Sequence, residues 1–468
     1  MCSACQTAPR RPPASPVHRC LMRFKRLMRQ PRFQRATQTA DRGFYERIFT
    51  PLVTLWYMIF QHLHSDHTLE AAVLDLHAGG ADRLCSHPQT PPSQKIRSTA
   101  TTAFSKARAR LPLAVFSAAL SAQAQEIWKE VREGHWRGLR VVLLDGSQLT
   151  LRPHPGIVRR FEPSANQKGP AYWVLMRVVA LFCLHTGVVV ASAVGAASVS
   201  EQALACQLIL QGLAGCLYVG DRNFGIFWVV HRVLDAHAHC LFRLTDTRAR
   251  RLAQCGGRIR CAGDYPLHWI PSKFDRRRPE CCRPALPGRL IVAQYARPGF
   301  RIRWIYLFTT LTDAQTYSAE HLFELYAMRW HIEVNLRYLK TQMNLAQLEC
   351  KSADMAQKEW MAGLLAYNLV RALMLSAALS EGLQPSVLSF SAARRALLGW
   401  LLRQDAGPRH STAWTSLLKR VARLRQPTRA KPRPPEPRAK RHKRDTFPPL
   451  RGSRAIARMN AERLAAKS

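Results

Sequence analysis

The sequence predicts a mixed α/β fold in which a helical region precedes a sheet that is covered by helices. Residues 43–131 carry apolar side chains at helical spacing, with a loop near residues 78–95 that is rich in Gly, Pro and Ser. Further along the chain, apolar runs of strand length at 139–145, 172–194 and 216–221 alternate with segments of helical spacing. Strands that alternate with helices in this way are typical of an α/β sheet.

The chain is strongly basic. It has 70 Lys and Arg against 30 Asp and Glu, a formal net charge of +40. Basic side chains in such an excess repel one another. A protein usually carries so large a positive charge because it binds a polyanionic partner, either nucleic acid or an anionic membrane. The only apolar stretch of membrane length, 173–197, contains Arg177 and a turn signal at 185–187, so two buried strands in a hairpin are favoured over a membrane span. Nucleic acid is therefore the expected partner.

The start of the chain and its cysteines indicate a cytoplasmic protein. The N-terminus contains arginines and prolines but no apolar stretch of the kind found in a secretory signal. The 13 cysteines show no disulfide-like framework, so we expect them to be reduced.

The composition suggests four regions. Residues 1–35 are expected to be a basic mobile arm, and 36–135 an all-helical DNA-binding domain with a basic face that includes Lys106, Arg108 and Arg110. The alternative for this domain is a helical scaffold with ordinary surface charge. Residues 136–404 hold the α/β region. Residues 405–468, rich in Arg, Lys and Pro, are expected to be a disordered tail that binds DNA backbone.

Two of the predicted strands end in an aspartate. Asp145 follows the apolar run 139–144, and Asp221 follows the run 216–220. Each residue alone is weak support for a site, because Asp-Gly and Asp-Arg-Asn are also common turn sequences. In an α/β sheet, however, the carboxyl ends of the strands gather on one side, where ligands bind. We therefore expect the two carboxylates to lie close together.

The segment at 317–345 is predicted to be one continuous helix, because it contains no Gly or Pro and its apolar residues recur at helical spacing. Seven residues bring a helix back to nearly the same face, so Tyr326, Glu333 and Lys340 would form a row. Arg329 lies one turn before Glu333. A carboxylate among a phenol and two cations is suited to holding a metal ion and phosphate together. The alternative is a solvated face with ordinary charge pairs.

Three carboxylates that converge at one edge of a sheet repel one another unless a cation neutralises them. Hard oxygen ligands suit Mg²⁺ or Mn²⁺, and a site with two ions suits phosphoryl transfer. Asp145, Asp221 and Glu333 are the residues expected to form such a site.

At these positions the chain resembles the DDE transposases of the IS-four insertion-sequence family. In the family signature, Arg follows Tyr after two residues, Glu follows after three more and Lys after six more, and all the gaps are satisfied by Tyr326, Arg329, Glu333 and Lys340. Asp145 in Leu-Leu-Asp-Gly-Ser matches the first catalytic acid, and Asp221 in Gly-Asp-Arg-Asn-Phe-Gly matches the second. The resemblance spans roughly residues 40–375.

The resemblance implies a ribonuclease H-like catalytic core with a β-rich insertion at about 245–302. It implies that Asp145, Asp221 and Glu333 are catalytic and bind a pair of Mg²⁺ ions, for which Mn²⁺ can substitute. It also implies that a second set of residues holds DNA phosphates, namely Tyr326, Arg329 and Lys340.

The resemblance also singles out a tryptophan. Trp304 stands where relatives carry a tryptophan that stacks on a flipped base, and Trp269 is a weaker candidate for this role. The alternative for Trp304 is a strand residue packed in the core.

The sequence thus predicts a transposase that moves an insertion sequence by cut-and-paste transposition, through metal-dependent strand cleavage and strand transfer. Its expected partners are double-stranded DNA, as terminal inverted repeats and as target, and a second copy of the chain in a synaptic homodimer. It would act in the bacterial cytoplasm, at the nucleoid. One alternative is a catalytically silent, transposase-derived DNA-binding protein or regulator. The presence of all three acids argues against this alternative. Another is a metal-dependent nuclease without strand transfer, which only its products would distinguish.

Overall fold

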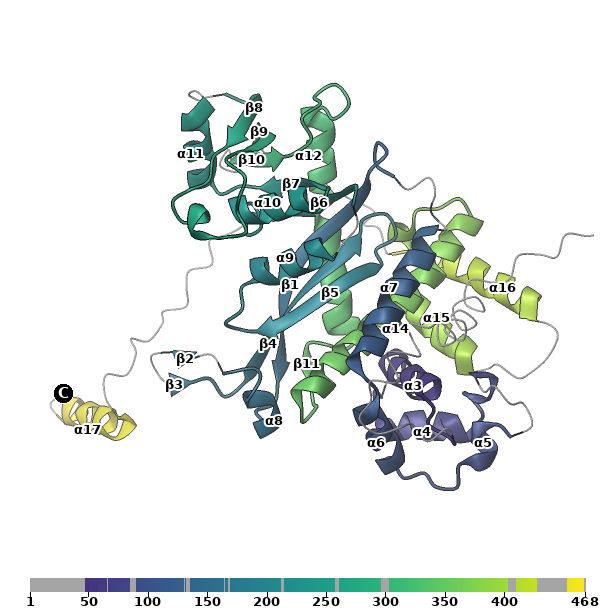
Figure 1. The fold of residues 1–468 in the computed structure, drawn as a ribbon. Helices are drawn as coiled ribbons and strands as arrows, with labels where there is room; N and C mark the ends of the chain where they lie inside the picture. Colours follow the sequence, from purple (N-terminus) through teal and green to yellow (C-terminus); the bar gives the residue numbers. More distant parts are fainter. Residues whose placement is uncertain are drawn as a thin grey trace, which may run out of the picture. The chain divides into compact units, whose positions relative to one another are not determined.

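The computed structural model describes residues 47–426 and 453–466, with gaps at 65, 85–89, 130, 132–134, 164, 167–168, 212–213, 257–260, 296–302 and 403–409. The arm expected at 1–35 lies outside the described residues. The chain divides into two compact units, of which the larger comprises 1–293 and 304–427 and the smaller 294–303 and 428–468. The larger unit contains the sheet and the helices that cover it (Figure 1).

A nine-stranded sheet forms the centre of the larger unit. Its order is β5-β4-β1-β6-β7-β10-β9-β8, and β11 (Gln347–Leu348) pairs in parallel with β1. The predicted hairpin is present as β4 (Val174–Cys183) and β5 (Val189–Ala196), which pair antiparallel. β4 is also antiparallel to β1 (Arg140–Leu151), whereas β6 (Cys216–Gly220) and β7 (His239–Arg243) run parallel to β1. The mixed α/β class is confirmed, and this arrangement is in keeping with the ribonuclease H-like core that we expected.

Alternate residues of β1 point to opposite faces of the sheet, as strand geometry requires. Val142 and Leu144 pack with α9 (Glu201–Leu210) and α10 (Phe227–Asp235). Val141 and Leu143 pack in a second core with α14 (Ala353–Ser380) and α7 (Leu113–Lys129). The central strands are therefore buried on both faces, which explains why their sequences are continuous apolar runs.

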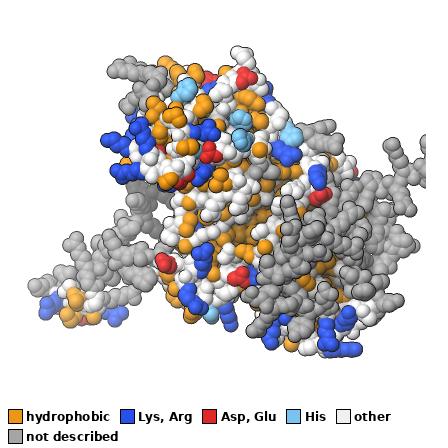
Figure 2. Space-filling model, viewed as in Figure 1, with side chains coloured by type: hydrophobic (Ala, Val, Ile, Leu, Met, Phe, Trp, Pro, Cys, Tyr) orange, Lys and Arg blue, Asp and Glu red, His pale blue; other side chains and the backbone are white. Residues whose placement is uncertain are grey.

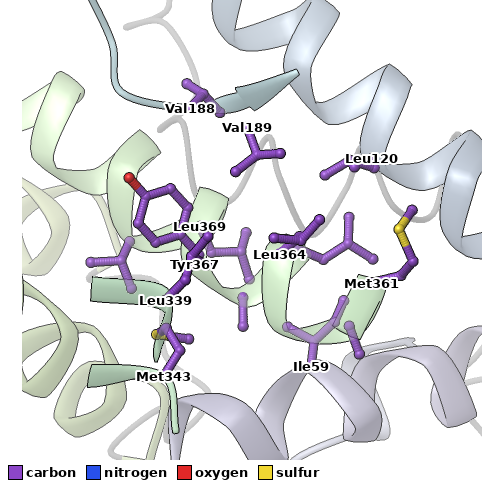
Figure 3. Close-up of a cluster of buried hydrophobic side chains, with 14 of the residues drawn as sticks. Ile59, Leu120, Val188, Val189, Leu339, Met343, Met361, Leu364, Tyr367 and Leu369 are labelled. Atoms are coloured by element: carbon purple, nitrogen blue, oxygen red, sulfur yellow. The ribbon is translucent and has the colours of Figure 1, made fainter. Parts of the chain in front are cut away.

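The N-terminal helices share the second core with α14. They are α3 (Pro51–Leu63), α4 (Leu69–His77), α5 (Pro92–Lys95), α6 (Thr102–Arg110) and α7. Figure 3 shows Ile59 of α3 and Leu120 of α7 beside Leu364 of α14. The predicted helices are thus present, and they join the same hydrophobic cluster as one face of the sheet.

Arg108 does not belong to an exposed basic face. Only 8% of Arg108 is accessible, and its Nη2 donates to Glu359 Oε1 of α14 at 2.6 Å. Its assignment to DNA phosphates was therefore wrong, because a carboxylate of the protein already pairs with it. Lys106 of the same helix is exposed.

The insertion adds strands to the edge of the central sheet. It contains α11 (Asp246–Gly256), β8 (Gly263–Trp269) and β9 (Leu286–Tyr295), and β10 (Arg303–Thr309) leads back by pairing antiparallel with β7. Trp269 is buried against Phe308 and Phe227, so it is a core residue and not a base-stacking candidate.

The helical part of the chain extends beyond the boundary expected at residue 404. α15 (Phe390–Leu402) is followed by α16 (His410–Arg423), and Trp414, Leu417 and Val421 of α16 are buried in the core shared with α14. The expectation of a disordered tail starting at 405 was therefore wrong for residues 410–423. Arginines on the exposed face of α16 gave it the composition of a tail, while its apolar face packs on the protein. α17 (Arg454–Ala465) lies in the smaller unit.

The expectation that 173–197 is the only apolar stretch of membrane length was wrong. Among the described helices, α14 alone has the length and hydropathy of a membrane span, and 94% of its most apolar window is buried within the protein. It is the central helix of the second core, as its neighbours in Figure 3 show. The described cysteines are free, as expected. Shorter elements are η1 (Asp82–Leu84), α8 (Pro155–Val158), β2 (Ala165–Asn166), β3 (Gly169–Pro170), η2 (Asp275–Arg277) and η4 (Pro385–Val387).

Candidate active site

The structure places Asp145 and Asp221 beside each other in the sheet. The parallel register of β1 and β6 ends with Leu144 opposite Gly220, and each aspartate is the next residue along the chain, Asp145 within β1 and Asp221 directly after β6. Neighbouring strands lie about 4.8 Å apart, so the two carboxylates start from adjacent backbone positions. The expectation that the strand ends at Asp145 was wrong, because β1 continues to Leu151 in antiparallel pairing with β4. Only the pairing with β6 stops at the acids.

The environment of Asp145 disfavours its negative charge. Burial is the main cause that raises the pKa of Asp145 to about 6, and the charges of Asp221 and Glu201 add to the rise. A hydrogen bond of 2.8 Å from the Gly146 N–H and the charge of Arg329 act in the opposite direction. Burial and the neighbouring carboxylates thus outweigh the stabilisation of the Asp145 charge by Gly146 and Arg329.

The expected continuous helix at 317–345 is divided into three parts. α12 (Ala319–Ala327) ends in a tight turn, in which the Arg329 N–H donates to the Tyr326 carbonyl at 3.0 Å. α13 (Trp330–Arg337) follows, and a π-helical turn, η3 (Tyr338–Gln342), contains Lys340. The prediction of one helix was wrong, and with it the assumption of regular helical spacing along the row. The absence of Gly and Pro left the turn without a sequence signal, because its i,i+3 bonds need no special residue.

Arg329 connects the helix with the sheet despite this turn. Its Nη2 donates to Glu333 Oε1 at 2.6 Å, and its Nη1 lies 3.7 Å from Asp145 Oδ2. Burial raises the pKa of Tyr326, the charge of Arg329 opposes this rise, and the charge of Asp221 adds to it. The structure thus brings together both aspartates, Glu333, Arg329 and Tyr326.

The remaining candidates lie apart from these contacts. Lys340 is half-buried, and its ammonium has no partner within the described ranges. Trp304, on β10, is 38% exposed, so the alternative of a core tryptophan does not hold for it.

Glu201 is a fourth acid at the site, and sequence reasoning missed it. It lies in the first turn of α9, where its carboxylate accepts a hydrogen bond of 2.6 Å from Asn223 Nδ2. The backbone N–H of Asn223 donates to Asp221 Oδ1 at 2.9 Å, so one asparagine links both acids. A Cβ at Gly146 would lie 2.6 Å from the Glu201 carboxyl carbon, so the glycine of the Asp-Gly pair makes room for Glu201. An acid after the N-cap Ser200 is also ordinary helix chemistry, so the sequence carried no signal for this role.

The chemistry of the donor set suits a hard divalent cation. Its carboxylates come from β1, the residue after β6, α9 and α13. Within the described ranges, no group of three or more Asp, Glu, His or Cys side chains is placed so that it could hold a metal ion in the present arrangement. Arg329 partly neutralises Asp145 and Glu333 in their present arrangement.

A family model described as "Transposase DDE domain" matches residues 136–369, half of the chain. The chain belongs to the DDE transposase family. It is also 26% identical over 298 residues to the "Transposase InsG for insertion sequence element IS4" of Escherichia coli (strain K12), which places it in the IS4 group of these enzymes as expected. That match covers 62% of this chain and 65% of the relative's length.

Among solved structures, this DDE transposase is similar to a chain described as "Cryo-EM structure of piggyBac transposase synaptic complex with hairpin DNA (SNHP)". The TM-score is 0.40 with 12% sequence identity, over 86% of this chain and 84% of the other.

The contacts of Arg329 lead to a first prediction for this transposase. We expect Arg329→Ala to lower strand transfer from pre-cleaved element ends by about a hundredfold, because it removes the planar cation between Asp145 and Glu333. Arg329→Lys should restore only part of the rate, since an ammonium keeps the charge but loses the bidentate geometry. Lys340→Ala should also impair transfer if its free ammonium holds DNA.

The matched control is Arg337→Ala, which removes an exposed cation from the same helix. If both Arg329→Ala and Lys340→Ala transfer strands at the wild-type rate, the two residues are ordinary charges on a helix surface and do not position DNA.

Proposed function

We propose that this chain catalyses cut-and-paste transposition of an insertion sequence, by metal-dependent strand cleavage and strand transfer at the ends of the element. The observation that carries the proposal is the adjacent pair Asp145 and Asp221 at the end of the β1–β6 pairing, joined to Glu333 through Arg329. Family membership supports DNA phosphoryl transfer as the reaction class.

Asp145, Asp221 and Glu333 would hold Mg²⁺, with Mn²⁺ as a substitute and two ions as the expected number. When bound, the metal neutralises charge on the phosphoryl group and activates the attacking water or 3′-hydroxyl. The protein's own groups prepare this site. Asn223 fixes Asp221 through its N–H and Glu201 through its amide, and Glu201 keeps the local charge negative enough to favour a cation.

The cations and aromatics near the acids would position DNA. Arg329 can grip a phosphate through its planar fork when it leaves the carboxylates, and Lys340 can act as a point charge. Tyr326 lies near Arg329 and would donate its hydroxyl to the phosphate that Arg329 holds. Trp304 is exposed enough to stack on a base.

A basic surface on the insertion supports double-stranded DNA as the partner, with terminal inverted repeats and target DNA as the two substrates. Figure 2 shows Lys and Arg side chains gathered over the part of the molecule that carries α11 and η2. Exposed arginines of these elements include Arg250, Arg251, Arg276 and Arg277. Such cations bind the DNA backbone without reading its sequence. We further propose a homodimer in the synaptic complex, acting in the bacterial cytoplasm.

The deciding experiment incubates the full chain with Mg²⁺ and labelled DNA that carries the ends of its own element. We expect cleavage to a 3′-hydroxyl, followed by joining of that end to a target plasmid. DNA binding without cleavage in Mg²⁺ or Mn²⁺ would overturn the proposal in favour of a silent DNA-binding protein. Cleavage without joining would identify a nuclease.

A further inference from the structure

Arg371 differs from the other buried cations of the described chain. Four Lys or Arg side chains are buried there, and three of them have a carboxylate partner. Arg108 pairs with an acid at 2.6 Å, Lys358 with one at 2.5 Å, and Arg289 pairs with Asp264. Arg371, only 6% exposed, has no described carboxylate within ion-pair distance. A buried charge is costly unless it is paired, and the described residues provide no counter-ion for this guanidinium.

Neutral groups hold the Arg371 guanidinium in place. Its Nε donates to the Tyr367 hydroxyl at 2.8 Å, and its Nη2 donates to Asn335 Oδ1. The rings of Tyr338, Tyr367 and Phe390 lie with their centroids 5.5–5.9 Å from the guanidinium carbon. Aromatic faces attract a cation, but they do not neutralise it.

A cavity of about 190 Å³ opens beside this guanidinium. Arg371, His331, Tyr338 and Gln426 line it, and none of its lining residues is an Asp or Glu. The guanidinium packs directly against Gly187, because a Cβ there would lie 2.6 Å from the Arg371 guanidinium carbon.

A second cavity, of about 240 Å³, shares His185 and His331 with the first and is likewise free of acids. It adds Arg140, whose guanidinium lies 4.9 Å from the centroid of the Trp128 ring. Arg140 starts β1, about 16–17 Å along the strand from Asp145 at about 3.3 Å per residue. The two cavities therefore form a positive recess that is separate from the carboxylates, while α13 contributes residues to both places.

We propose that the Arg371 cavity binds a phosphate group, which supplies the counter-ion that the described residues do not provide. The phosphate is that of a DNA strand or of a small phosphate compound. The arrangement of cations beside tryptophans favours DNA, since grooves that bind nucleic acid strands combine these two features. The identification of DNA as the molecule that carries this phosphate rests on the proposed function, whereas the binding of phosphate itself does not.

Asn335→Asp tests the proposal because it places a carboxylate on the guanidinium with almost no change of shape. Thermal unfolding of the full chain is measured in phosphate, in pyrophosphate and in chloride at equal ionic strength. The wild type should show a saturable rise in Tm, by about a few degrees, in phosphate or pyrophosphate over chloride. Asn335→Asp should have a higher Tm in chloride and no response to phosphate, since its counter-ion is built in.

Arg371→Met gives a second test, because it should lose the response by removing the cation. The control is Arg108→Met, which removes a buried arginine that has an acid partner and should keep the response at a lower Tm. Equal Tm values of the wild type in phosphate and chloride, or a full response by Asn335→Asp, would overturn the proposal and leave Arg371 a structural residue.

A binding measurement then distinguishes the two sources of phosphate. Fluorescence anisotropy with short labelled DNA, in buffer without divalent metal, should show about tenfold weaker binding by Asn335→Asp, through loss of a phosphate contact. Unchanged DNA affinity beside a lost phosphate response assigns the cavity to a small phosphate compound. Neither measurement depends on catalysis, so both remain readable if the chain proves to be a silent DNA-binding protein.

Discussion

Replacing Asp145 or Asp221 by Asn, or Glu333 by Gln, is expected to lower strand cleavage by roughly a thousandfold or more, because each amide removes a charged oxygen ligand from the metal site. DNA affinity should change little, since the cations that contact the backbone remain. Cleavage of labelled element ends in Mg²⁺ and DNA binding without metal are the two measurements.

Thermal unfolding gives a readout that does not depend on the reaction. Asp145→Asn removes the repulsion with Asp221 and Glu201 that contributes to the raised pKa of Asp145. We therefore expect the variant to be at least as stable as the wild type without metal, and to lose the stabilisation that Mn²⁺ or Mg²⁺ confers on the wild type. Glu324→Gln, an exposed acid on α12, is the matched control and should behave as wild type. Near-normal cleavage by any one of the three variants would remove that residue from the catalytic set.

Glu201→Gln should have a smaller effect than the three variants. It keeps the shape beside Gly146 and the contact with Asn223, but loses a negative charge. Supporting groups of this kind are typically worth about 10- to 100-fold in metal affinity or activity. A loss as complete as that of Asp221→Asn would instead make Glu201 a direct ligand.

Two C-terminal truncations are expected to give opposite results. Ending the chain after Gln404 removes α16 and exposes the core that Trp414, Leu417 and Val421 cover. At about 1.5–3 kcal/mol for each buried side chain, the loss is roughly 5 kcal/mol or more, comparable with the whole stability of many domains. We expect this shorter chain to be insoluble or to unfold far below the wild type.

Ending the chain after Pro427 keeps α16 and removes the basic run at 438–444. This chain should unfold with the wild-type Tm, bind any DNA more weakly and show a flatter dependence of affinity on salt, because fewer phosphates are neutralised. The ratio of specific to non-specific binding should stay nearly constant. Wild-type stability of the chain that ends at Gln404 would show that α16 is dispensable, and a selective loss of end recognition after Pro427 would show that the tail reads sequence.

Much of the fold was predictable because the sequence pattern reports local burial directly. The hairpin β4–β5 and the strand that ends before Asp221 were both expected from apolar runs. The prediction failed where a helix is polar in overall composition but packs one apolar face against the protein. α16 was assigned to the tail because Lys419, Arg420 and Arg423 are basic, although Trp414, Leu417 and Val421 of the same helix are buried.

The candidate site was predictable to the extent that it depends on sequence spacing. The signature gaps, together with two acids after apolar runs, were enough to name Asp145, Asp221 and Glu333 as candidates. The spacing alone did not give the positions of these side chains in space. The prediction assumed a regular helix, whereas the structure has a turn at Arg329 and a π-helical turn at Lys340.

The sequence by itself determined which family the chain resembles, which strands are buried and which three acids are the candidates. The tertiary structure alone decided what each charge contacts. It paired Arg108 with a glutamate of α14, placed Arg329 between two carboxylates and brought Glu201 beside Asp145. Among the described residues, it left Arg371 without an acid partner. The physical reason is that hydrophobic periodicity depends on neighbours within one element. Charge pairing depends on groups far apart in sequence, which only the packed fold brings within a few ångströms.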